Sequence, residues 1–122
     1  MIEIRREDFC VDEIIKNMKA PKIGALSIYL GTVRELPEGA GLEFGDNDQA
    51  VHKLSQIREK AISRFDVEDV TIVHRVGFLG ISENIVLVAV SASHRESAFG
   101  ACRSIIDDIK DLHKSWGKVV SK

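Results

Sequence analysis

The stretch Ile85-Val-Leu-Val-Ala-Val-Ser91, followed by Ser93-His-Arg-Glu96, decides how this chain is expected to fold. The first part is a short, almost wholly apolar run, which is typical of a strand buried on both faces. Ser93 and Glu96 have the spacing of a capping box, in which each side chain bonds to the other's backbone N–H. We therefore expect a helix from this box to about Lys114, with a buried face formed by Ala98, Ala101, Cys102, Ile105, Ile106, Ile109 and Leu112.

The segments before this strand and helix carry further apolar patterns. A short helix is expected at residues 11–20, and a second helix is expected after Asp48 as its N-cap. The apolar stripe of that second helix consists of Val51, Leu54, Ile57, Ala61, Ile62 and Phe65. A short Val119-Val120 tail follows Trp116 at the end of the chain.

Strands are expected at residues 23–33, 70–74 and 76–80. Gly24 and Gly31 lie inside the first of these, where glycine indicates a bulge or a close approach of two backbones. The glycine-, proline- and acid-rich residues 34–47 are expected to form a loop, with at most a short strand at 42–44.

The order of these elements is not the strict strand–helix alternation of a parallel sheet. It favours an α+β fold with a mostly antiparallel sheet and helices packed on it. With 122 residues, the chain is expected to be a single domain spanning residues 1–122. A domain of this size can bury a sufficient core without disulfides or metals.

Composition excludes several classes of protein. Lys and Arg number 17 against 19 Asp and Glu, a net charge of −2, which excludes a general nucleic-acid binder that relies on overall positive charge. The charge is uneven, because six basic and four acidic residues lie from His94 onward. No apolar run approaches the length of a membrane span, and charges interrupt the N-terminus, so no membrane association and a cytoplasmic location are expected.

The cysteines and histidines offer no metal or disulfide framework. Cys10 and Cys102 are expected to be buried or half-buried free thiols. The four histidines lack the spacing of metal ligands, so no metal and no cofactor are expected.

Three positions could bind an anion. His94 and Arg95 fall in the first turn of the long helix, where free N–H groups and the helix dipole favour a phosphate or carboxylate. The alternative is a solvated arginine beside a packed neutral histidine. Arg34 lies where a strand meets a loop, a common place for ligand-binding residues, and its alternative is a surface ion pair with Glu35 or Glu38.

At two further positions, the sequence leaves open whether the residues have a structural role or act at a site. His74 and Arg75 end a strand and could be packed and paired structurally or contact a ligand. Lys110 lies near the end of the long helix, where a lysine can serve the helix dipole or enter a pocket and act in catalysis. Lys114 has the position of an ordinary helix-terminal cation.

Four stretches of the sequence resemble the large, catalytic subunit of molybdopterin synthase. They are Gly24-Ala25 with Tyr29-Leu-Gly-Thr-Val-Arg34, then Ile72-Val-His-Arg-Val-Gly77, then Val88-Ala-Val-Ser-Ala-Ser-His-Arg-Glu-Ser-Ala-Phe99, and finally Asp107 to Trp116 with Lys110. Together they span about three-quarters of the chain. The resemblance implies the α/β-hammerhead-like fold of that subunit.

The resemblance also implies an activity. The family transfers sulfur from the thiocarboxylated Gly-Gly C-terminus of a small ubiquitin-like subunit to cyclic pyranopterin monophosphate, forming the dithiolene of molybdopterin. It implies a homodimer of large subunits with a small subunit at each end, a heterotetramer. The alternative is a catalytically weak homologue that keeps the dimer and binds a ubiquitin-like sulfur-carrier protein.

The resemblance assigns roles to particular residues. Lys110 matches the family's active-site lysine, while the family's second lysine falls on Gly117, so its neighbour Lys118 becomes the second catalytic candidate. Arg34, His94 and Arg95 become candidates for binding the substrate phosphate. The family's C-terminal extension, which helps close the pocket, is nearly missing, so the sequence resembles a divergent and C-terminally short member.

Overall fold

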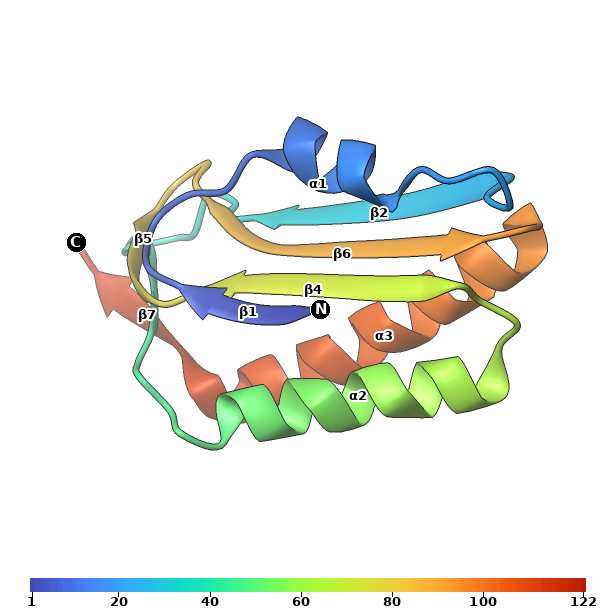
Figure 1. Cartoon of the computed structure of the whole chain (residues 1–122). Coiled ribbons are helices and arrows are strands. Elements are labelled where there is room, and N and C mark those ends of the chain that lie inside the picture. The colour runs from blue at the N-terminus through green and yellow to red at the C-terminus, as the bar shows by residue number, and fades with distance from the viewer.

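The computed structural model describes all residues from 1 to 122, and Figure 1 shows a long sheet with helices on both faces. A smaller sheet lies at one end of the long sheet. In chain order, the elements are β1 (Ile2–Arg5), α1 (Val11–Met18), β2 (Ala25–Thr32), β3 (Gly39–Phe44), α2 (Ala50–Arg64), β4 (Asp69–Arg75), β5 (Gly77–Gly80), β6 (Asn84–Ala92), α3 (Arg95–Trp116) and β7 (Gly117–Ser121).

The main sheet has the strand order β1-β4-β6-β2, and the small sheet has the order β5-β3-β7. Only β1 and β4 pair in parallel, and every other neighbouring pair is antiparallel. The predicted α+β class with a mostly antiparallel sheet is therefore confirmed.

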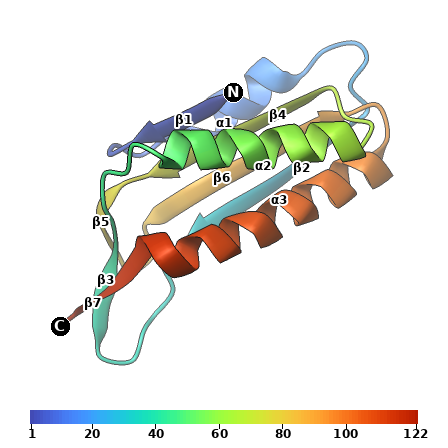
Figure 2. The same ribbon diagram turned by 90° about the horizontal axis from the view of Figure 1, so that it is seen from below.

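Both faces of the central strand β6 are buried, as its apolar sequence predicts. Val86, Val88 and Val90 belong to the large core under α2 and α3, which lie side by side across one face of the sheet (Figure 2). Leu87 faces the other way and packs with Phe9 in a small core beneath α1. Alternation along the strand thus divides one apolar run between two cores.

The capping box predicted at Ser93 is wrong. Helix α3 begins at Arg95, its N-cap is His94 in an extended conformation, and no side chain caps it. The reason is a close approach of two backbones, because a Cβ placed on Gly24 would lie 2.3 Å from the Ser93 carbonyl oxygen. This contact confirms the expected close approach at Gly24 and places Ser93 in the short bend between β6 and α3.

The N-cap predicted for the second helix is also displaced. Gln49, not Asp48, is the N-cap of α2, and the Asn47 side chain accepts a hydrogen bond from the Gln49 N–H. The helix then begins at Ala50, which is buried, while Val51 is exposed and lies off the predicted apolar stripe.

Residues 39–44 form a longer strand than the expected 42–44, because β5 and β7 pair with both of its edges. The bulge expected in β2 is confirmed by a register shift between Gly31 and Thr32.

Cys102 is buried as expected, whereas Cys10 is exposed, because it precedes α1 at the surface. None of the helices combines the length and apolar character needed to cross a membrane.

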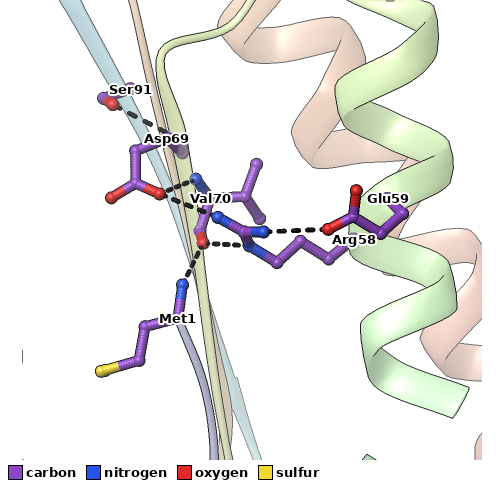
Figure 3. A network of polar contacts seen from close by, with 6 residues as sticks. All are labelled: Met1, Arg58, Glu59, Asp69, Val70 and Ser91. Atoms are coloured by element: carbon purple, nitrogen blue, oxygen red, sulfur yellow. Dashed lines mark hydrogen bonds and ion pairs between the residues drawn. The ribbon is translucent and has the colours of Figure 1, made fainter. Parts of the chain in front are cut away.

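Strand β1 is not among the strands that the sequence predicts. Polar contacts at the chain's first residue help to hold it against β4 (Figure 3). The Met1 ammonium donates a hydrogen bond to the Val70 carbonyl oxygen at 2.7 Å. Arg58 of α2 donates to the same oxygen at 2.9 Å and also binds the Asp69 carboxylate at 3.1 Å. The three contacts join β1, β4 and α2.

Candidate active site

A cavity of about 390 Å³ lies where the main sheet, the small sheet and the C-terminal half of α3 meet. Its lining comes from β2, the loop after β2, β3, β6 and α3. The lining residues are Tyr29, Gly31, Thr32, Arg34, Leu36, Leu42, Ile85, Val86, Val88, Ile106, Ile109, Lys110 and His113. Most of these are apolar, so the few polar groups among them stand against walls that offer no competing hydrogen bonds.

Two of the residues singled out from the sequence, Arg34 and Lys110, line this cavity together. Neither side chain forms an ion pair, so the alternative of an Arg34 pair with Glu35 or Glu38 is wrong. Two unpaired cations beside an apolar surface attract an anion more strongly than the same cations in open water.

The fold holds each of these cations at the cavity by a different element. Arg34 directly follows the buried Val33, whose backbone bonds to Glu83 and Ser82 in the turn before β6. Lys110 lies on the face of α3 that also carries Ile106, Ile109 and His113, and that face looks into the cavity. The cations come together only through the packing of α3 on the sheet.

His113 is a cavity residue that the sequence analysis did not single out. Its Nε2 lies 2.8 Å from Nε2 of His74, and Nδ1 of His74 lies 2.7 Å from the Arg75 carbonyl oxygen. Burial, reinforced by the His113 ring, lowers the pKa of His74 to about 3. Burial and the nearby Lys110 charge lower the pKa of His113 to about 4, so both rings are neutral at pH 7.

An aromatic cluster surrounds this histidine pair. The ring of Phe44 from β3 lies 4.9 Å from both histidine rings and 5.4 Å from the Trp116 ring, measured between centroids. The Trp116 indole N–H donates to the Gly45 carbonyl oxygen at 2.8 Å. The cluster fastens the small sheet to α3 beside His113, the one member of the cluster that lines the cavity.

The structure does not bring Lys118 to this cavity. In β7 it pairs with Glu43, on the opposite face of the small sheet from Leu42, and it lines a separate depression of about 220 Å³. The neighbouring Gly117 faces the Phe44 ring, and a Cβ placed there would lie 2.8 Å from a ring carbon. The catalytic role of Lys118 stays a prediction that this arrangement does not favour.

His94 and Arg95 also lie away from the cavity. Both are exposed at the beginning of α3, and Lys110 is fifteen residues beyond Arg95, or ~22 Å along a helix at 1.5 Å per residue. Their phosphate-binding role stays a prediction, because the fold of this chain does not place them beside Arg34 and Lys110.

His74 and Arg75 are packed and paired within the fold, which is the structural one of the two roles that the sequence left open. Arg75 is buried and donates hydrogen bonds to the Arg6 and Asn84 carbonyl oxygens and to the Glu83 carboxylate. It therefore holds the segment after β1 and the turn before β6, and it does not line the cavity. The structure contains no group of three or more metal-ligating side chains.

The comparisons with known proteins agree on one family. The sequence model of the MoaE protein family matches residues 4–112. The molybdopterin synthase catalytic subunit of Pyrococcus abyssi is 36% identical over 119 residues, a match that covers 94% of this chain and 80% of that protein.

Solved structures have the same fold. The crystal structure of molybdopterin synthase from Staphylococcus aureus matches with a TM-score of 0.85 and 30% identity, covering 98% of this chain and 90% of that one. A complex of subunits 1 and 2 of the molybdopterin-converting factor from Helicobacter pylori matches with a TM-score of 0.72 at 23% identity, covering 89% and 77% of the two chains, which supports the fold alone. The chain therefore belongs to the MoaE family of molybdopterin synthase catalytic subunits, which are enzymes of molybdenum cofactor biosynthesis.

Proposed function

We propose that this chain transfers sulfur from the thiocarboxylated Gly-Gly C-terminus of a small ubiquitin-like subunit to cyclic pyranopterin monophosphate, forming the dithiolene of molybdopterin. The observation that carries the proposal is the meeting of Arg34 and Lys110 at one apolar-walled cavity. Both the cyclic phosphate and a thiocarboxylate are anions, and neither cation is committed to an acidic side chain of this chain.

The two cations suit different parts of this chemistry. Arg34 can bind a phosphate through two parallel N–H donors, which gives orientation as well as attraction. Lys110 presents a compact charge at the lining of the cavity, where it stabilises the thiocarboxylate and moves protons as the carbon–sulfur bonds form. The apolar walls exclude water and strengthen both interactions.

We propose a small partner subunit and a homodimer of this chain as the working assembly, a heterotetramer. The partner is supported by the two-subunit complex that shares this fold in Helicobacter pylori. The cavity is not fully enclosed, which an extended C-terminal tail needs in order to enter it.

Reconstitution tests the activity directly. The purified chain is mixed with thiocarboxylated small subunit and cyclic pyranopterin monophosphate, and molybdopterin is measured as its fluorescent oxidation product. Product formation supports the proposal. Absence of product while the partner still binds would contradict it.

Substitution of Lys110 tests the proposed role of the cavity. We expect Lys110→Ala to lower kcat by about 100-fold or more without weakening partner binding, because an acid–base or charge-stabilising group is lost. The matched control is Lys114→Ala, one turn further along α3, where the lysine is exposed and pairs only with Asp111. A loss of less than about threefold in Lys110→Ala would assign catalysis elsewhere.

A second candidate function is a catalytically weak homologue that keeps the dimer and binds a ubiquitin-like sulfur-carrier protein. The observation that favours it is the position of Lys118, which leaves Lys110 as the only lysine of the cavity. Partner binding with no turnover in the reconstitution would select this candidate.

A further inference from the structure

The His74–His113 pair has no part in the function proposed so far, yet one member of it lines the cavity. His113 lies one turn beyond Lys110 on α3, so the two side chains share the cavity face of the helix. An apolar pair would fill this aromatic cluster without the cost of removing two imidazoles from water. Packing alone therefore does not explain why both residues of this pair are histidines.

The hydrogen bonds determine which ring nitrogens carry protons. A carbonyl oxygen only accepts, so Nδ1–H of His74 donates to Arg75, and Nε2 of His74 carries no proton while that ring is neutral. Nε2 of His74 must then accept from Nε2–H of His113. Neutral His113 consequently has a free lone pair on Nδ1.

This Nδ1 atom is accessible and has no partner within the chain. Nδ1 of His113 makes no hydrogen bond within the chain, and no buried side-chain nitrogen or oxygen in the structure lacks a partner. Nδ1 is therefore accessible to a donor, and the residue that carries it lines the cavity together with Lys110. Burial, and after it the charge of Lys110, lowers the pKa of His113, which keeps the ring neutral and leaves the lone pair available.

We propose that His113 is a positioning residue, whose free Nδ1 accepts a hydrogen bond from the Lys110 ammonium once that exposed side chain turns toward it, and so holds the cation over the cavity. This inference rests on the proposed function for its catalytic consequence, but its geometry does not depend on turnover. His74 takes part by holding His113 in the tautomer that accepts. Without this acceptor, an exposed lysine samples many rotamers and spends little time where an anion would bind.

Nuclear magnetic resonance of the full-length protein tests the geometry without any substrate. In ¹⁵N-labelled wild type at pH 7, we expect His113 to show a protonated Nε2 and an unprotonated Nδ1. We expect the Lys110 ammonium to give a ¹H–¹⁵N signal protected from exchange, which His113→Phe removes while Lys114 stays unchanged. A protonated Nδ1, or a Lys110 signal unaffected in His113→Phe, would overturn the proposal.

Kinetics of the reconstituted enzyme test the consequence. His113→Phe keeps a ring of similar size but has no nitrogen, whereas His113→Gln can donate to His74 and accept from Lys110. We expect His113→Phe to lower kcat by about tenfold with a smaller change in KM, and His113→Gln to recover most of it.

Circular dichroism melting of both variants separates positioning from stability. A loss of kcat in His113→Phe that simply follows its melting temperature, or equal losses in both variants, would contradict the positioning role. Should the wild type make no product, the proposed function fails, and the resonance experiment still decides the role of His113.

Discussion

At the scale of single residues, Gly117 shows how one position can be closed to a side chain. Its would-be Cβ meets the ring of Phe44, which is almost fully buried and packed against both histidines of the pair and Trp116. The ring has little room to move, because its three aromatic neighbours come from two elements, β4 and α3. A lysine at position 117 would fit only if the Phe44 ring lay elsewhere or a smaller residue replaced it.

We expect Gly117→Ala to lower the free energy of unfolding by about 1–3 kcal/mol, because the added methyl group overpacks the Phe44 cluster. The matched control is Gly45→Ala, where a Cβ would meet nothing within 4 Å. Urea unfolding followed by circular dichroism measures both variants. Equal stability of the two alanine variants would show that Phe44 moves aside freely.

At the scale of elements, β1 is held by hydrogen bonds that no local sequence pattern predicts. The Val70 carbonyl oxygen accepts from both the Met1 ammonium and Arg58, and Arg58 is anchored in turn by Asp69 (Figure 3). The Val70 carbonyl oxygen is thus the shared acceptor that links the N-terminus of the chain and α2 to β4. Desolvation lowers the pKa of the Met1 ammonium, which is consistent with its partly buried place in the sheet.

We expect Arg58→Met to lower the free energy of unfolding by about 1–2 kcal/mol, because the methionine keeps most of the apolar stem but loses the hydrogen bonds to Val70 and Asp69. Arg64→Met on the same helix serves as the control, because Arg64 is exposed and forms no ion pair or side-chain hydrogen bond. Hydrogen exchange at the Ile72 amide, which bonds to the Met1 carbonyl oxygen, reports the coupling to β1. Unchanged exchange at Ile72 in Arg58→Met would contradict it.

At the scale of the whole molecule, the histidine pair connects α3 to the main sheet and makes stability depend on pH. In the unfolded chain both histidines titrate near pH 6.5, whereas in the folded protein the pKa values are about 3 for His74 and about 4 for His113. Between these limits the unfolded state binds more protons than the folded state. The free energy of unfolding therefore falls as pH drops from about 6.5 toward 4, and this contribution is fully present above pH 6.5.

We expect the slope of this loss to approach about 2.7 kcal/mol per pH unit, the limit for two histidines, between pH 6 and pH 4. His113→Gln removes one titrating group and should reduce the slope by about half. His52→Gln, at an exposed position of α2, should leave it unchanged. Urea unfolding at a series of pH values measures all three proteins, and identical slopes would show that the pair is not buried in its neutral form.

The sequence determined those features that local patterns encode. The apolar run of residues 85–91 is the central strand β6, the helical stripe ending at Leu112 packs on the sheet, and Gly24 marks a close backbone approach. Hydrophobic periodicity and the exceptional size of glycine act within a few residues, so they can be recognised without a structure. The family resemblance rests on such local stretches and is confirmed.

Tertiary structure alone decided which of the candidate residues meet. Arg34 and Lys110 share a cavity because α3 lies across β2 and β6, whereas Lys118 turns away through strand alternation and Arg95 lies at the far end of the helix. The pairing of His113 with His74 joins residues 39 positions apart, and the N-terminal ammonium reaches Val70 across the sheet. Such contacts depend on packing and burial, which bring distant segments together and have no signature in the local order of residues.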